Sequence, residues 1–94
     1  MAVTVRIPGV LRAEAGGQSS LQCGAAEGMT LAMVLDEIGA TWPLLDRRIR
    51  DERGELRRYV NLYVDGEECR RLDGLRTPVS DRTEILVVPS VAGG

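Results

Sequence analysis

The sequence ends in two glycines, Gly93 and Gly94, and the carboxylate of Gly94 is the group best placed by the sequence to undergo chemistry. Glycine has no Cβ and adopts backbone conformations that other residues avoid, so another protein can close tightly around such an end. A carboxylate is a poor acyl donor because its leaving group would be oxide. We therefore expect any reaction at Gly94 to begin with its activation by another molecule.

The rest of the sequence supplies few catalytic groups. It contains no His, and all twelve of its basic residues are Arg, so no lysine is present to accept an isopeptide bond. Cys23 and Cys69 lie far apart without a CxxC partner, and two thiols do not make a structural zinc site. We expect them to be small buried residues, with a disulfide or a redox role as the alternatives. The sequence therefore predicts a protein that is not an enzyme and binds no metal or cofactor.

Length and charge limit the remaining classes. A chain of 94 residues forms one domain. Its net charge of −2 argues against nucleic acid as a partner, because phosphate binding needs a basic surface. No apolar run is long enough to cross a membrane, and the first residues resemble neither a signal nor a transit peptide. We expect a cytoplasmic protein with no membrane partner.

The first half of the sequence predicts two strands and a helix. Apolar residues alternate over residues 3–7 and again over residues 19–23, which predicts a hairpin with a long loop. Thr30 is a good N-cap for a helix. Its apolar stripe consists of Leu31, Val34, Leu35 and Ile38. Gly39 and then Trp42-Pro43 are expected to end this helix.

Residues 43–58 are harder to interpret. Leu44, Leu45 and Ile49 are compatible with a short helical turn. The remainder is dominated by charge, with six arginines interleaved among four carboxylates, and Gly54 interrupts it. Two interpretations stay open: a solvated connection with mixed salt bridges, or a patch that docks a partner.

The second half predicts a hairpin and a final strand. Residues 59–64 alternate clearly, and Asp65-Gly66 favours a two-residue type I′ turn. Residues 67–72 are expected to return as a short polar strand, and residues 84–88 to form the last strand before Pro89. The resulting order is hairpin, helix, connection, hairpin, strand.

This order is α+β and is that of the β-grasp, or ubiquitin-like, fold, with a mixed sheet and one main helix on one face. We expect a domain over residues 1–89 and a flexible tail over residues 90–94. The predicted core consists of Val3, Val5, Ile7, Leu31, Val34, Leu35, Ile38, Val60, Leu62, Val64, Ile85 and Val87.

Residues 3–8, 30–38, 59–66 and 81–94 together resemble the MoaD/ThiS family of ubiquitin-like sulfur carriers over nearly the whole chain. Residues 58–64 and 89–94 look most similar to the branch of that family that serves cysteine synthesis. The resemblance implies that an E1-like partner uses ATP to adenylate Gly94, and that a sulfur nucleophile then leaves a thiocarboxylate there. It also implies a sulfur-accepting synthase, with a pyridoxal-phosphate enzyme preferred, and a metallopeptidase as a further candidate partner.

Other roles remain open. Within the family, the carrier serves either as the small subunit of molybdopterin synthase or as the sulfur donor to thiamine or thiosugar synthesis. A different class of role is that of a ubiquitin-like modifier joined to target proteins. In each case we expect partners to grip the end of the last strand and the tail. The predicted partner-binding residues are Leu86, Val88, Pro89, Val91, Ala92, Gly93 and Gly94.

Overall fold

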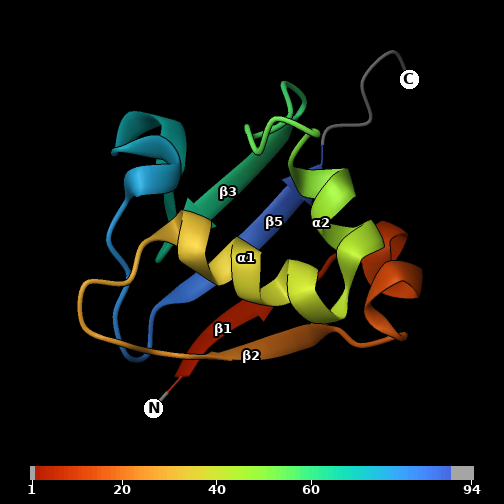
Figure 1. Cartoon of the computed structure of the whole chain (residues 1–94), viewed down its shortest axis with the longest axis horizontal. Coiled ribbons are helices and arrows are strands. Elements are labelled where there is room, and N and C mark those ends of the chain that lie inside the picture. The colour runs from red at the N-terminus through yellow and green to blue at the C-terminus, as the bar shows by residue number, and fades with distance from the viewer. Residues whose placement is uncertain (1, 90–94) are drawn as a thin grey trace.

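The computed structural model describes residues 2–89. Its framework is a five-stranded mixed sheet in the order β2-β1-β5-β3-β4, shown in Figure 1. The strands are β1 (Ala2–Arg6), β2 (Ser20–Gly24), β3 (Val60–Val64), β4 (Glu67–Glu68) and β5 (Glu84–Pro89). The first and last strands, β1 and β5, are parallel neighbours, whereas the other pairs are antiparallel. This is the β-grasp arrangement that the order of elements predicts.

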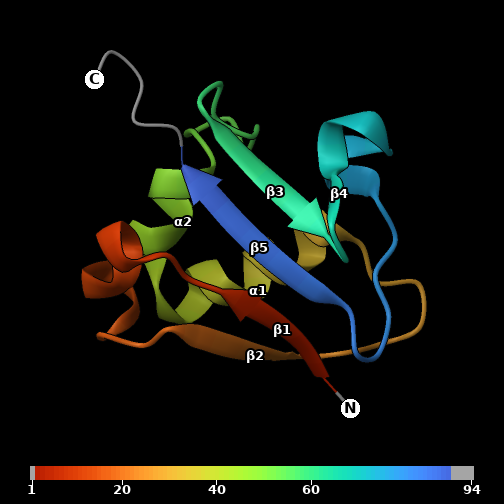
Figure 2. The same ribbon diagram turned by 180° about the vertical axis from the view of Figure 1, so that it is seen from behind.

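Two α-helices cover one face of the sheet, α1 (Leu31–Thr41) and α2 (Pro43–Ile49). As predicted, Thr30 caps α1: its side-chain oxygen accepts a hydrogen bond from the backbone N–H of Met33 at 3.4 Å. Short 3-10 helices lie at Gly9–Ala15, Cys69–Arg71 and Gly74–Arg76. The view from behind shows the strands lying in front of α1 and α2, so this second sheet face is left open by both helices (Figure 2).

The core lies between the sheet and the two helices. All twelve residues predicted to form it are buried, with at most 7% of any of them exposed. Leu45 and Ile49 of α2 join them with no exposed surface, which the sequence analysis did not predict. Because they stand four residues apart on one helix, both side chains point to the same side. The expected short helical turn is therefore a packed second helix.

The close approach of α1 and α2 also explains Gly39, which lies inside α1 and does not end it. A Cβ at Gly39 would lie 2.8 Å from the carboxylate oxygen Oδ2 of Asp46 on α2. Such a distance is too short for a real contact, so glycine at this position lets the two helices approach.

The predicted polar strand over residues 67–72 is wrong beyond Glu68. Residues Cys69–Arg71 form a 3-10 turn, and the Cys69 side chain is completely buried. Its burial pulls the chain toward the core and ends the pairing with β3 after two residues. Similarly, the long loop of the first hairpin contains the 3-10 helix Gly9–Ala15, which buries Leu11 and Ala15.

The Asp65-Gly66 turn sets the register of the sheet's second half. Its two residues have φ of 49° and 89°, as a type I′ turn requires. The Asp65 N–H donates to the carbonyl of Glu84 at 2.8 Å, and the Asp65 carboxylate accepts from the N–H of Glu84 at 2.9 Å. These two bonds fix the start of β5 against β3, so that Val60 pairs with Pro89 at the other end.

Candidate functional site

The end of β5 is where the sheet presents the predicted reactive tail. Because β1 and β5 are parallel, the C-terminal ends of both strands lie at the same end of the sheet, and β3 begins there opposite Pro89. Pro89 is half-buried at this end of the sheet. The predicted site residues Val91, Ala92, Gly93 and Gly94 lie outside the described residues.

Side chains of β5 alternate between the core and the open face of the sheet. Ile85 and Val87 are buried beneath the helices, whereas Leu86 is 43% exposed and Val88 is half-buried. Cross-strand partners share a face, and Leu86 is opposite Tyr63 of β3 in the register. The open face therefore carries an apolar patch of Leu86, Val88 and Tyr63, which we call the open-face patch.

Tyr63 was not named as a site residue in the sequence analysis. The signal for it was present, since Asn61 and Tyr63 are the positions of β3 that alternate with the buried Leu62. What the sequence lacked was the pairing of β3 with β5, which brings Tyr63 beside Leu86.

Polar contacts border the open-face patch and hold the edge near Pro89. Arg6 and Glu84 form an ion pair at 2.9 Å, and both side chains are more than half exposed. Arg70 donates to the carbonyls of Val60 and Arg57, each at 2.8 Å, and to the side chain of Asn61. A surface ion pair stabilises little, whereas Arg70 ties the start of β3 to the preceding loop.

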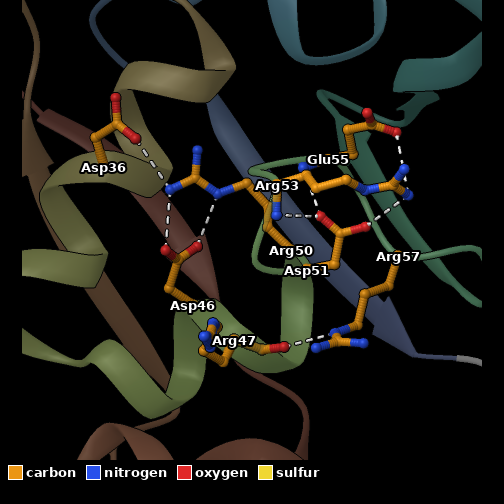
Figure 3. Close-up of polar contacts among 8 residues, drawn as sticks. All are labelled: Asp36, Asp46, Arg47, Arg50, Asp51, Arg53, Glu55 and Arg57. Atoms are coloured by element: carbon orange, nitrogen blue, oxygen red, sulfur yellow. Dashed lines mark hydrogen bonds and ion pairs between the residues drawn. The ribbon is translucent and has the colours of Figure 1, made fainter.

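A second group of charges lies on the helix side, shown in Figure 3. Arg50 is only 8% exposed, and its guanidinium lies between two carboxylates. It contacts Asp46 of α2 at 2.8 and 2.9 Å and Asp36 of α1 at 3.0 Å. The hydrogen bonds that Arg50 donates to Asp46 raise the pKa of Arg50, so the residue stays charged and links both helices to the chain that follows them.

The loop after Arg50 is held by Asp51. Its carboxylate accepts the backbone N–H groups of Arg53 at 2.9 Å and Glu55 at 3.1 Å. These bonds, led by that from Glu55, lower the pKa of Asp51. Arg53 contacts the same carboxylate at 3.3 Å, and this hydrogen bond raises its own pKa. Local hydrogen bonds therefore hold the loop in shape.

Neither thiol is placed for catalysis. Burial, followed by the neighbouring carboxylate of Glu37, raises the pKa of Cys23 to about 11. Burial also raises the pKa of Cys69. Both cysteines are free and buried, as the sequence analysis expected.

Within residues 2–89, no three His, Cys, Asp or Glu side chains come together in a way that could hold a metal ion. Over the same residues, neither α-helix has the length and apolar character needed to cross a membrane.

The comparisons with known proteins agree with this geometry. The pattern that defines the ThiS family matches residues 5–94. The sulfur carrier protein CysO of Mycobacterium tuberculosis is 40% identical over 96 residues, which cover all of both chains. Small archaeal modifier protein 3 of Haloferax volcanii is 33% identical over 81 residues, covering 86% of this chain and 87% of the other.

A solved structure is also similar. The CysO chain of the Amycolatopsis orientalis BexX/CysO complex superposes with a TM-score of 0.85 at 35% identity, covering 99% of this chain and 100% of that one. That carrier was therefore captured while bound to another protein, BexX. The family match and these similarities show that the chain belongs to the ThiS family of ubiquitin-like sulfur carriers, which are not enzymes.

Proposed function

We propose that the chain carries sulfur as a thiocarboxylate on Gly94 and donates it to the synthesis of cysteine. The observation that carries this proposal is the 40% identity to CysO over the full length of both proteins. The Gly93-Gly94 end supplies the carboxylate that this chemistry needs. The chain itself acts as a protein-borne substrate, and its partners supply the catalysis.

The proposed activation needs an E1-like partner and ATP. The partner joins the Gly94 carboxylate to AMP and releases pyrophosphate, so that AMP becomes the leaving group. A sulfur nucleophile then displaces AMP and leaves the thiocarboxylate. The open-face patch and Pro89 are the proposed contact with this partner, because exposed apolar side chains in a group mark interaction sites. ATP belongs to the partner, and we propose no cofactor bound by this chain.

The proposed acceptor is an electrophilic alkene that a pyridoxal-phosphate enzyme makes from an amino acid. The thiocarboxylate sulfur adds to this alkene and forms a thioester between Gly94 and the new cysteine. The cysteine amine then attacks the thioester carbonyl within the same molecule, which moves the link to an amide. A metallopeptidase is the proposed partner that hydrolyses this amide and restores the Gly-Gly end.

The test is the intact mass of the chain after incubation with the activating enzyme, ATP and a sulfur source. We expect a gain equal to the mass difference between sulfur and oxygen. Deleting Gly94 should abolish that gain and leave the fold intact, since residues beyond the last strand contribute little to stability. If the shortened chain gains sulfur as readily as the full chain, Gly94 is not required as the residue that carries the sulfur.

A second candidate function is protein modification, in which Gly94 is joined to lysines of target proteins. The similarity to small archaeal modifier protein 3 favours it. The two functions differ in product, because conjugates survive on a denaturing gel and a free thiocarboxylate does not produce them. Chains of this protein linked to itself through lysine are excluded by its lack of lysine.

A further inference from the structure

A cleft of about 550 Å³ lies beside the end of β5. Its walls come from the loop before β3, from α2 and from the 3-10 helix after β1. Its lining includes Pro89 and four arginines, Arg48, Arg53, Arg57 and Arg58. It therefore includes the last described residue before the tail.

The cleft is cationic although the chain as a whole is acidic. Four arginines and two carboxylates line it, which leaves a formal charge of +2, whereas the net charge of the chain is −2. Arg53 is paired with Asp51 at 3.3 Å, and Arg48 is paired with Glu14 at 3.0 Å. Within residues 2–89, Arg57 and Arg58 make no ion pair, so the excess charge is concentrated on them.

Arg57 is held in place by hydrogen bonds of both its backbone and its side chain. Its N–H donates to the carbonyl of Ile49 at 2.9 Å, and its own carbonyl accepts from Arg70 at 2.8 Å. Its Nε donates to the carbonyl of Arg47 at 2.6 Å, as Figure 3 shows. The terminal nitrogens have no hydrogen-bond partner among the described residues. A guanidinium held in this way loses little freedom when it binds a carboxylate.

Apolar surface accompanies the charge. Leu11 and Val60 are buried below the cleft, and Leu56 and Pro89 are half-buried. Tyr59 is 55% exposed, and the guanidinium of Arg58 lies 5.9 Å from the centre of its ring. Arginine and tyrosine around an apolar centre are the side chains that protein interfaces favour.

We propose that this cleft binds a segment of a partner protein that is rich in Asp and Glu. Two separate guanidiniums around an apolar floor suit a peptide, which carries separate carboxylates and apolar groups along its length. Asp51 and Glu55 in the same cleft disfavour a compact dianion such as phosphate. The identification of the partner as the enzyme that acts on the tail rests on the proposed function and on the position of Pro89. The binding of an acidic segment does not depend on the proposed function.

The probe is a blocked hexaglutamate peptide, titrated into the full chain and followed by the backbone amide signals in nuclear magnetic resonance spectra. We expect saturable shifts at the cleft residues, which shrink as salt is added. Hexaglutamine is the neutral control, and inorganic phosphate is the test for a simple anion site. The variant is the double substitution Arg57→Gln and Arg58→Gln. Its matched control, Arg76→Gln with Arg82→Gln, removes the same charge outside the cleft.

The cleft variant should bind hexaglutamate about tenfold more weakly than the parent, while the control variant should bind within about twofold of it. Spectra of each variant without peptide establish that it is folded. Equal weakening in both variants would reduce the effect to overall charge and overturn the proposal, as would saturable binding of phosphate but not of peptide. Loss of sulfur loading in the Gly94-deleted chain with peptide binding intact would separate this site from the tail chemistry.

Discussion

At the scale of single residues, the protein keeps its own nucleophiles away from the chemistry proposed for its tail. The thiolate, and not the thiol, attacks electrophiles, and burial of Cys23 raises its pKa to about 11. Cys69 is buried as well, and its pKa is also raised. The activated Gly94 terminus that we propose would thereby be protected from attack by the chain's own cysteines.

This burial predicts slow alkylation. Iodoacetamide at pH 8 should label neither cysteine of the folded chain within the time that labels both in urea, as counted by intact mass.

The raised pKa of Cys23 also predicts how stability depends on pH. The unfolded Cys23 thiol ionises near the ordinary value of 9.0, whereas the folded thiol keeps its proton up to about 11, so the free energy of unfolding falls as the pH rises between them. Rapid labelling of Cys23 in the folded chain would contradict both predictions, because both require a buried, protonated thiol.

The burial of Arg50 could not be predicted from residue types alone. In the sequence it is one of six arginines in a charged run, and nothing in the composition separates it from its neighbours. In the structure it is buried between Asp36 and Asp46. The spacing of Asp46 and Arg50 at i, i+4 was the available signal, but it is informative only if residues 43–49 form a helix. The Asp65-Gly66 turn, whose chemistry is local, was predicted correctly.

At the scale of elements, α2 was expected only as a short helical turn, because its pattern is short. Seven residues beginning with Pro43 contain one i, i+4 apolar pair, which does not distinguish a packed helix from a turn. Packing against α1 distinguishes the two, and at this contact a Cβ on Gly39 would meet the Asp46 side chain of α2. No periodicity in the sequence shows this contact. Strands 3–7, 59–64 and 84–88 were found because each alternates over a full element.

Two adjacent leucines of α2 test its role. Leu45 is completely buried, whereas Leu44 is 70% exposed. Leu45→Ala should lower the free energy of unfolding by about 2–5 kcal/mol, since it leaves a cavity in the core. Leu44→Ala, the matched control, should change it by less than about 0.5 kcal/mol. Urea unfolding with an unchanged m-value measures both, and similar effects in the two variants would mean that α2 does not pack as described.

At the scale of the whole molecule, the element order was sufficient to predict the β-grasp fold and its core. The family pattern spans the same residues. The cleft at the end of β5 was not predictable, because it joins residues 11, 48–60 and 89, which only the completed fold brings together. The charged run was recognised as a docking patch or a solvated connection, but its geometry requires α2 and the pairing of β3 with β5.

The parallel pairing of β1 with β5 also has a mechanical consequence. The two strands lie side by side in the same direction, so Ala2 and Pro89 are at opposite ends of the sheet (Figure 2). A force that pulls these two residues apart acts along both strands and shears all the β1–β5 hydrogen bonds together. Arg6 and Pro89 lie at the same end of the sheet, so a force between them would separate the β1–β5 hydrogen bonds one after another.

Single-molecule stretching through linkers at these two pairs of positions should therefore give a higher rupture force for Ala2 with Pro89 than for Arg6 with Pro89. Equal forces would show that the β1–β5 ladder is not the element that resists. If the ladder does resist, an enzyme can draw on the chain beyond Pro89 along the strand direction without peeling the sheet open. The fold then resists force that is applied through its own C-terminal end.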